Sequence, residues 1–385
     1  EIYNMLSYCM PQEEFDAMSI RNVDDFVRLF GKIQIVDKMM TSGEVQSRDG
    51  LVGFQNLDAL RSLFHKYTNM KDAKDVNLPL PPHSDSEHVV TILPEQEKLY
   101  TMLRKEAKES TQKKKDGQET RHMFSIIRDM DRVTTDLDLY YRTITFLYPL
   151  EQKAKVEEMI ASLPQTIKGK VEDEDGKNKT GEIVLTTKLE VKTSDEPPHF
   201  KVSYPEAYEE TVLLAHKKFK LDESKISHPM MPKYAQLIQN AKQHYENAKG
   251  KQLVFTEEKS QHNKVSRILS QHIPMSDEEI GIINASTADG DKLQKISDRY
   301  NSGQYRLIIA NKKAEVGVNL QKGTEAIHHL TLPWTPASIQ QRNGRGVRQG
   351  NVAKHIKIYY YYGKGTFDVY RKDILEKKAN WMKEL

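Results

Sequence analysis

The residues best suited to chemistry lie near the end of the chain, where residues 341–350 read Gln-Arg-Asn-Gly-Arg-Gly-Val-Arg-Gln-Gly. Arg345 and Arg348 stand three residues apart, a spacing that brings two side chains together on one face of a helix. Paired guanidinium groups can grip phosphate oxygens bidentately while negative charge builds on them. Gly344, just before the first arginine, predicts a close approach of the backbone to a partner. The pattern indicates phosphate chemistry; a solvated basic helix end is the alternative.

The elements that must position these arginines are short apolar runs that alternate with stretches of helical periodicity. Strands are predicted at 252–256, 279–285, 306–310, 326–332 and 356–362, and helices at 260–272 and 289–301. Such alternation predicts a parallel sheet with helices on both faces. Ligands of these sheets bind at the carboxyl ends of the strands. Polar motifs are predicted to follow those ends, namely Ser286-Thr287, the segment from Asn311 to Asn319, and the segment from Trp334 to Arg348.

Five motifs occur in a fixed order over this region. They are Ala285-Ser286-Thr287, Asp298-Arg299-Tyr300-Asn301, Glu315-Val316-Gly317-Val318-Asn319-Leu320-Gln321, Pro333-Trp334-Thr335-Pro336 and the arginine motif. The series resembles the second RecA-like lobe of superfamily 2 helicases and translocases, and most of all the Snf2-type branch that translocates on double-stranded DNA. The Glu-x-Gly-x-Asn-Leu-Gln variant looks most like bacterial and phage members, some of which are fused to a DNA methyltransferase.

The resemblance implies a division of labour among the matching residues. ATP would lie between this lobe and a first RecA-like lobe that holds most of the nucleotide and its Mg²⁺. Arg348 matches the arginine finger, Arg345 its companion and Gln341 a glutamine that seats the nucleotide. Gly317 and Asn319 match the loop that couples nucleotide to DNA. The positions that would contact the DNA backbone, without reading its sequence, are Ser286, Thr287, Asn311 and Lys312.

The sequence also departs from the pattern of this branch. Lys313-Ala314-Glu315 replaces the usual Ala-Gly-Gly, and Ala310-Asn311 replaces a Ser-Thr pair. No phosphate-binding P-loop of the form G-x-x-x-x-G-K-[ST] occurs, nor an Asp-Glu pair after an apolar strand. We therefore expect a piece of a longer protein that hydrolyses no ATP by itself. The alternative is a non-catalytic structural or scaffolding module of a large, possibly phage, assembly.

Composition sets wider bounds. The 385 residues carry a net charge of +3, but residues 341–385 hold 11 lysines and arginines against 4 acidic residues. Such a basic stretch is typical of phosphate-binding surfaces. The single cysteine, Cys9, excludes an internal disulfide framework and suits a reducing compartment. No run of 18 apolar residues occurs, so no membrane partner is expected. A cytoplasmic location is predicted, or a virion-associated one if the protein is phage-encoded, and no metal-binding residues are predicted within the chain.

We predict an α/β protein with three regions. Residues 1–92 would be a helical trailing part of the first lobe and a connector, with 1–78 helical throughout. Residues 93–228 would be a helical protrusion with a small β-hairpin near 166–204, and residues 229–385 the second RecA-like lobe. Four consecutive tyrosines, Tyr359 to Tyr362, predict a strand buried on both faces; a base-stacking platform is the alternative.

Overall fold

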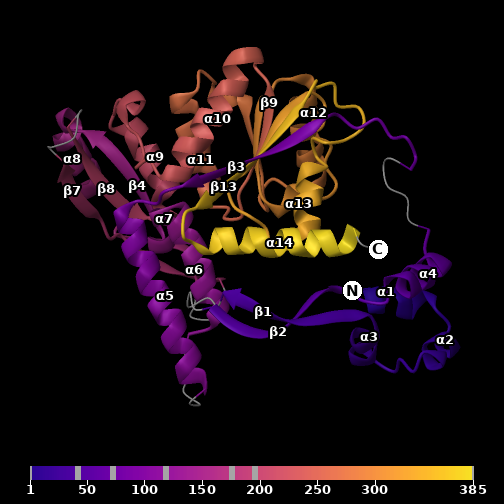
Figure 1. Cartoon of the computed structure of the whole chain (residues 1–385). Coiled ribbons are helices and arrows are strands. Elements are labelled where there is room, and N and C mark those ends of the chain that lie inside the picture. Colours follow the sequence, from indigo (N-terminus) through magenta and orange to yellow (C-terminus); the bar gives the residue numbers. More distant parts are fainter. Residues whose placement is uncertain are drawn as a thin grey trace.

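A six-stranded parallel sheet forms the centre of the C-terminal half of the computed structural model (Figure 1). The structure describes residues 2–39, 45–69, 75–115, 121–172, 178–192 and 198–383. In order of pairing, the strands are β10 (Ile280–Ile283), β11 (Leu307–Ala310), β9 (Lys251–Phe255), β12 (Thr324–His329), β13 (Ile356–Gly363) and β3 (His83–Val90). Five of them confirm predicted strands. The sixth, β3, comes from the connector, whose polar sequence does not predict a strand.

Helices cover both faces of this sheet, as predicted. One face packs against α10 (Pro232–Ala248), α11 (Gln261–His272), α5 (Pro94–Lys115) and α6 (Met123–Thr135). The other packs against α12 (Gly290–Ser302), α13 (Pro336–Asn343) and α14 (Phe367–Lys383). Strands buried on both faces need apolar side chains at every position, which explains their continuous apolar runs.

The four tyrosines of β13 alternate between these two cores. Tyr359 and Tyr361 lie in one core and Tyr360 and Tyr362 in the other, and none is more than 7% exposed. The prediction of a buried strand is confirmed. The base-stacking platform is wrong, because no tyrosine ring presents a free face to solvent.

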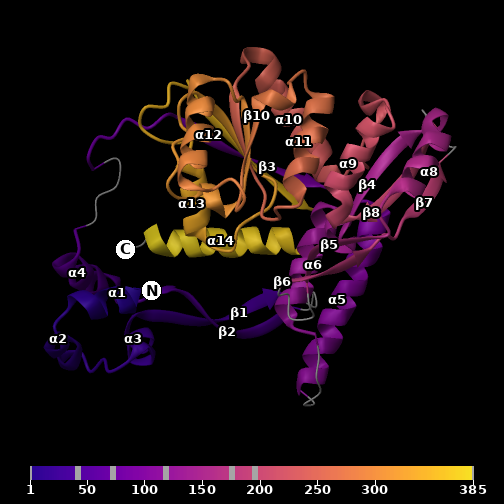
Figure 2. The ribbon, with the colours of Figure 1, turned by 180° about the vertical axis from the view of Figure 1, so that it is seen from behind.

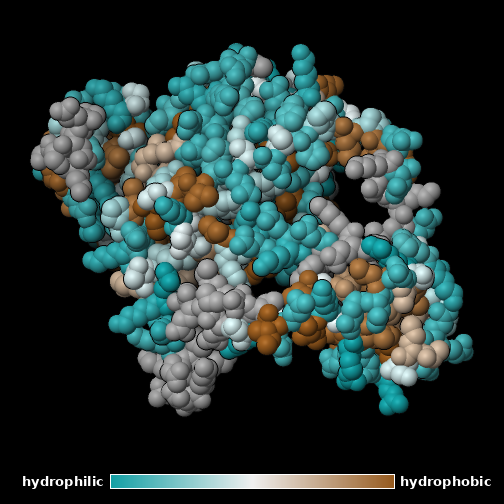
Figure 3. Space-filling view, viewed as in Figure 1, coloured by the Kyte–Doolittle hydropathy of each residue, from teal (hydrophilic) through white to brown (hydrophobic). Residues whose placement is uncertain are grey.

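The N-terminal residues are not helical throughout. Four helices, α1 (Ile2–Cys9), α2 (Gln12–Ala17), α3 (Val23–Phe30) and α4 (Leu57–Tyr67), surround a separate small core. Between α3 and α4, however, β1 (Gly31–Met39) and β2 (Val45–Phe54) form an antiparallel hairpin. Ile33 and Ile35 alternate with polar residues, a period of two that indicates a strand. Together with Leu51 they are exposed, and hydrophobic side chains gather over this part of the molecule in Figure 3.

The protrusion contains more β-structure than predicted. Its long helices α5 and α6 and the short α7 (Leu137–Tyr141) are followed by a small domain with its own core. Within 166–204, where a small β-hairpin is predicted, β5 (Thr166–Glu172) pairs antiparallel with β6 (Asn178–Val184). Beside it, β4 (Thr143–Pro149), β8 (His199–Pro205) and β7 (Lys188–Lys192) form an antiparallel sheet with α8 (Lys153–Ser162) and α9 (Glu209–Lys218). The strands β4 and β8 are far apart in the sequence, so no local pattern predicts that they pair.

The opposite views of Figures 1 and 2 show how these parts are arranged. The small β-domain stands on one side of the parallel sheet, and the α1–α4 unit lies on the other. The β1–β2 hairpin reaches back from that unit beneath α14 toward α6. No helix in the described part of the chain is long and apolar enough to cross a membrane.

Candidate nucleotide and nucleic-acid site

The arginine motif begins on a helix but does not stay on it. Thr335 caps α13, accepting a hydrogen bond from the amide of Ser338 at 3.3 Å, and the helix ends at Asn343. Arg345 and Arg348 follow in turns, so the predicted shared helix face is wrong. Instead, a tertiary contact brings the two arginines together on the loop that precedes β12.

That contact uses both guanidinium groups. Arg345 donates from Nη1 to the carbonyl of Val318 at 2.6 Å, and Arg348 from Nη1 to Oδ1 of Asn319 at 3.0 Å. Arg348 and Asn319 are exposed, whereas Arg345 is half-buried. Burial and the neighbouring charge of Arg348 lower the pKa of Arg345. An anion that bound both guanidinium groups would relieve this repulsion.

The arginines lie at the amino-terminal end of β12, and not at a carboxyl end as expected. Asn351 links the arginine loop to this end of β12, because its Nδ2 donates to the carbonyls of both Gly346 and Thr324 at 2.9 Å. The reason is that α13 starts after the carboxyl end of β12 and runs back across the face of the sheet. Gln341 is exposed near the end of α13, and its carbonyl accepts a 3.2 Å hydrogen bond from Nε of Arg345.

Within the lobe, Gly346 is the glycine that brings the arginine loop close to β12. Gly344 has an ordinary helical φ of −64°. A Cβ at Gly346, by contrast, would lie 2.9 Å from Cγ2 of Thr324 and 3.0 Å from Cδ1 of Ile327. Gly346 therefore seats the arginine loop directly on β12.

The loop of Gly317 and Asn319 is held from beneath by α12. The carbonyl of Asn319 accepts hydrogen bonds from Oγ of Ser297 at 2.7 Å and Nδ2 of Asn301 at 2.8 Å. Gly317 has a φ of +76°, which side chains rarely adopt, and its Cα faces open space. The motif that ends in Asn301 thus supports the loop, and the loop in turn supports the arginines.

The residues predicted to contact DNA lie at the carboxyl ends of two adjacent strands. Ser286 and Thr287 follow β10, Asn311 and Lys312 follow β11, and the amide of Asn311 donates to the carbonyl of Ile283 at 3.3 Å. Ser286 and Lys312 are exposed. This edge is where a ligand of a parallel sheet is expected.

Thr287 and Asn311 are the two of these four residues whose side chains bond to the backbone. The hydroxyl of Thr287 donates to the carbonyl of Ile282 and accepts from the amide of Asn284, both at 2.9 Å. Oδ1 of Asn311, which is 9% exposed, accepts from the amide of Lys313 at 3.1 Å.

Two further cations lie near these sites and are not among the predicted site residues. Lys259, exposed in the loop after β9, donates to Oγ of Ser286 and adds a charge to that edge. Its position just after a buried strand is the sequence feature that could have identified Lys259 as a site residue. Arg342 lies within the arginine motif itself and is completely buried. No local pattern distinguishes it from its exposed neighbours.

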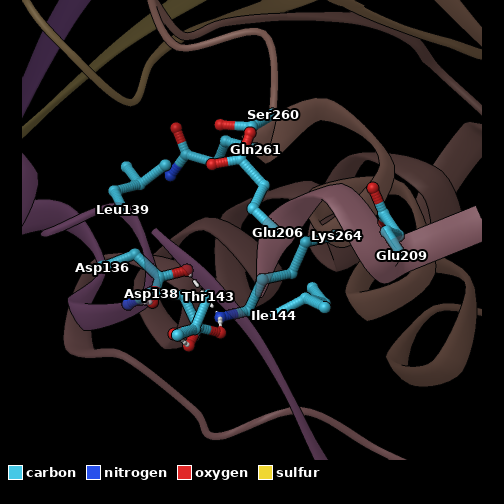
Figure 4. Close-up of a pocket in the computed structure, with 10 residues that line it drawn as sticks. All are labelled: Asp136, Asp138, Leu139, Thr143, Ile144, Glu206, Glu209, Ser260, Gln261 and Lys264. Carbon is cyan, nitrogen blue, oxygen red and sulfur yellow. Dashed lines mark hydrogen bonds and ion pairs between the residues drawn. The ribbon is translucent and has the colours of Figure 1, made fainter. Parts of the chain in front are cut away.

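A small cavity lies where the β-domain meets the lobe, between α7 and α11 (Figure 4). Nζ of Lys264 points at the carboxylates of Asp136 and Asp138, at 2.6 and 2.7 Å. Burial opposes the charge on Asp138, yet its pKa is lowered because Lys264, Thr145 and Thr143 donate to it. The cavity has a volume of about 10 Å³, which holds about one water and is too small for a nucleotide. The ion pairs of Lys264 beside it join α11 to α7. In the described ranges, no group of three or more His, Cys, Asp or Glu side chains is arranged to hold a metal ion.

The region that contains the predicted site residues resembles a known protein domain. Residues 232–350, which include every predicted site residue, match the helicase conserved C-terminal domain. The defense against restriction protein B of Escherichia phage P1 is 36% identical to this chain over 447 aligned residues. The match covers 100% of this chain but 19% of that protein, so the chain spans about a fifth of its relative.

Two solved structures show a more distant likeness. The C-terminal part of the Fun30 ATPase domain is 16% identical, with a TM-score of 0.47 over 77% of this chain and 90% of that one. The DUF1998 helicase MrfA bound to DNA is 15% identical, with a TM-score of 0.32 over 41% of this chain and 22% of that one. The matched segment and the six-stranded parallel sheet together show that this chain carries a helicase conserved C-terminal domain with a RecA-like fold.

Proposed function

We propose that this chain is the C-terminal part of an ATP-dependent DNA translocase of the Snf2 type. In this proposal its lobe completes a nucleotide site whose other half, including the groups that bind Mg²⁺, belongs to a first RecA-like lobe of the same polypeptide. The observation that carries the proposal is the convergence of Arg345 and Arg348 on the 317–319 loop, with the guanidinium of Arg348 left exposed.

The catalytic role proposed for this chain is electrostatic. Phosphoryl transfer spreads charge over the oxygens of the transferred group, and an arginine aimed at them is worth roughly 10³-fold or more in rate. Arg348 would act as this finger and Arg345 as its companion, while Gln341 contacts the nucleotide. Gly317 and Asn319 would report the state of the nucleotide, because they lie on the loop to which both arginines are bonded.

DNA would bind at the carboxyl edge of β10 and β11. Ser286 and Lys312 are exposed there, and Thr287 and Asn311 shape the same edge. Such contacts hold the phosphate backbone without reading sequence. Closing and opening of the two lobes in each nucleotide cycle would move this edge along the duplex.

The wider setting of the chain is part of the proposal. The phage relative is about five times longer than this chain, which leaves room for a first lobe and for a fused DNA methyltransferase. The relative is named for defense against restriction. A cytoplasmic or virion-associated location is also part of the proposal.

The test is DNA-stimulated ATP hydrolysis by the intact protein, compared with Arg348→Ala. We expect turnover to fall by about 10³-fold while ATP binding, followed with a fluorescent analogue, changes little. Normal turnover by the variant would refute the finger assignment. Absence of any DNA-stimulated hydrolysis by the unmodified protein would favour the alternative, a scaffolding module.

A further inference from the structure

The largest fully buried side chain of the described residues is a charged one. Arg342 has an exposed fraction of 0%, although it lies in α13 between the exposed Gln341 and the half-buried Arg345. A buried guanidinium is costly unless its donors are satisfied. The groups that bind this guanidinium therefore show which part of the structure depends on it.

Those partners come from three separate segments. Nε donates to Glu315 at 2.8 Å, Nη2 to Glu257, and Nη1 to the carbonyl of Thr331 at 3.3 Å. The guanidinium also lies over the ring of Phe255, 5.3 Å from its centroid. Glu257 follows β9, Thr331 follows β12, and Glu315 begins the loop that carries Gly317 and Asn319.

Glu315 is held from both oxygens. Its second oxygen accepts a 3.0 Å hydrogen bond from Oγ of Ser338, which also lies in α13. The start of the 315–321 loop is thereby clamped to α13, and the end of α13 carries Arg345 and Arg348 back to the same loop. The loop is fixed at its beginning by Arg342 and in its middle by Arg345 and Arg348.

We infer that Arg342 is a positioning residue for the reaction. It sets the distance between the arginine pair and the 315–321 loop by binding Glu315 and Glu257 at once. This inference rests on the proposed function for its consequence in catalysis, but its structural part concerns the loop alone. Only a planar guanidinium can serve three acceptors in a fixed fork, so a lysine cannot replace it.

The chain offers a matched control in Arg371. This arginine is 5% exposed, donates to the carbonyl of Leu332 at 3.1 Å and pairs with Asp131. It contacts neither Glu315 nor the arginine loop in the described residues, because its partners belong to α6 and to the segment after β12. Arg371→Lys should therefore cost a similar amount of stability without disturbing the loop.

The experiment compares Arg342→Lys and Arg371→Lys in the intact protein, below the unfolding temperature of each variant. For Arg342→Lys we expect hydrogen exchange of the amides of residues 315–321 to speed up by about tenfold or more. We also expect kcat to fall by about tenfold or more while the KM for ATP stays within about twofold. For Arg371→Lys we expect normal exchange in that loop and normal kcat.

Two outcomes separate this inference from the proposed function. Normal loop exchange in Arg342→Lys, with only a lowered melting temperature, would overturn the positioning role. Faster loop exchange in a protein that shows no ATP hydrolysis in any form would uphold the structural part and refute the proposed function.

Discussion

Arg348 donates a 3.0 Å hydrogen bond to Oδ1 of Asn319, and both side chains are exposed. This bond joins the arginine loop to the loop before β12 at the surface of the lobe. It orients a guanidinium that remains accessible to a ligand, as the proposed role of Arg348 as an arginine finger requires.

Removing this orientation should slow the reaction without unfolding the lobe. In Asn319→Ala we expect kcat for DNA-stimulated ATP hydrolysis to fall by about tenfold, because Arg348 loses its partner. The fold should survive, since Ser297 and Asn301 bond to the backbone carbonyl of Asn319 and not to its side chain. Gln349→Ala, an exposed amide beside Arg348, is the control and should keep normal kcat. Equal rates in the two variants would contradict the orienting role.

The contact of Gly346 with β12 predicts a steric effect. In Gly346→Ala the new methyl group would lie within 3.0 Å of Thr324 and Ile327 side chains, so we expect a loss of about 1–3 kcal/mol in the free energy of unfolding. Gly290→Ala is the matched control, because nothing lies within 4 Å of its Cβ position. That change should be neutral or slightly stabilising in urea denaturation. Two variants of equal stability would show that the arginine loop does not rest on β12.

Buried histidines predict a loss of stability in acid. Burial lowers the pKa of His329 to about 3, and those of His216 and His262 to about 4. The unfolded chain has histidine pKa values of about 6.5, so below that pH it binds more protons than the folded protein. The stabilisation is complete above pH 6.5 and declines as the pH falls toward 4, by about 1 kcal/mol per histidine at pH 5.5. Urea denaturation at pH 7.5 and pH 5.5 measures this; an unchanged free energy of unfolding would mean that these side chains are hydrated.

The ion pairs around Lys264 predict a large effect at the junction of the β-domain and the lobe. Lys264→Met would leave Asp136 and Asp138 buried and unpaired, and should cost about 3–5 kcal/mol of stability. Lys225→Met is the control, because its 2.6 Å pair with Glu151 is exposed on both sides and its loss should change the stability little. A small effect at Lys264 would imply that the two carboxylates take up protons when their partner is lost.

The central sheet was predictable because its strands carry their own signal. Leu253 to Phe255 and Leu307 to Ala310 are buried on both faces, so they read as apolar runs in any context. The strand β3 carries no such run. It forms a strand because its backbone pairs with the edge of the sheet at β13, from His83 to Val90. Likewise β4 pairs with β8 across a long stretch of sequence, and nothing local indicates that partnership.

The sequence by itself determined the fold class, the order of the motifs and the identity of Arg345 and Arg348 as phosphate-binding candidates, because those features depend on residue types and short spacings. The tertiary structure decided where these residues lie. It set the arginines in turns at the start of β12, made Gly346 the point of contact with that strand, and buried Arg342 among acceptors from three segments. Spacing along a chain reports neighbours within one helix or strand, whereas burial and partnership depend on which distant segments the packing of the core brings together.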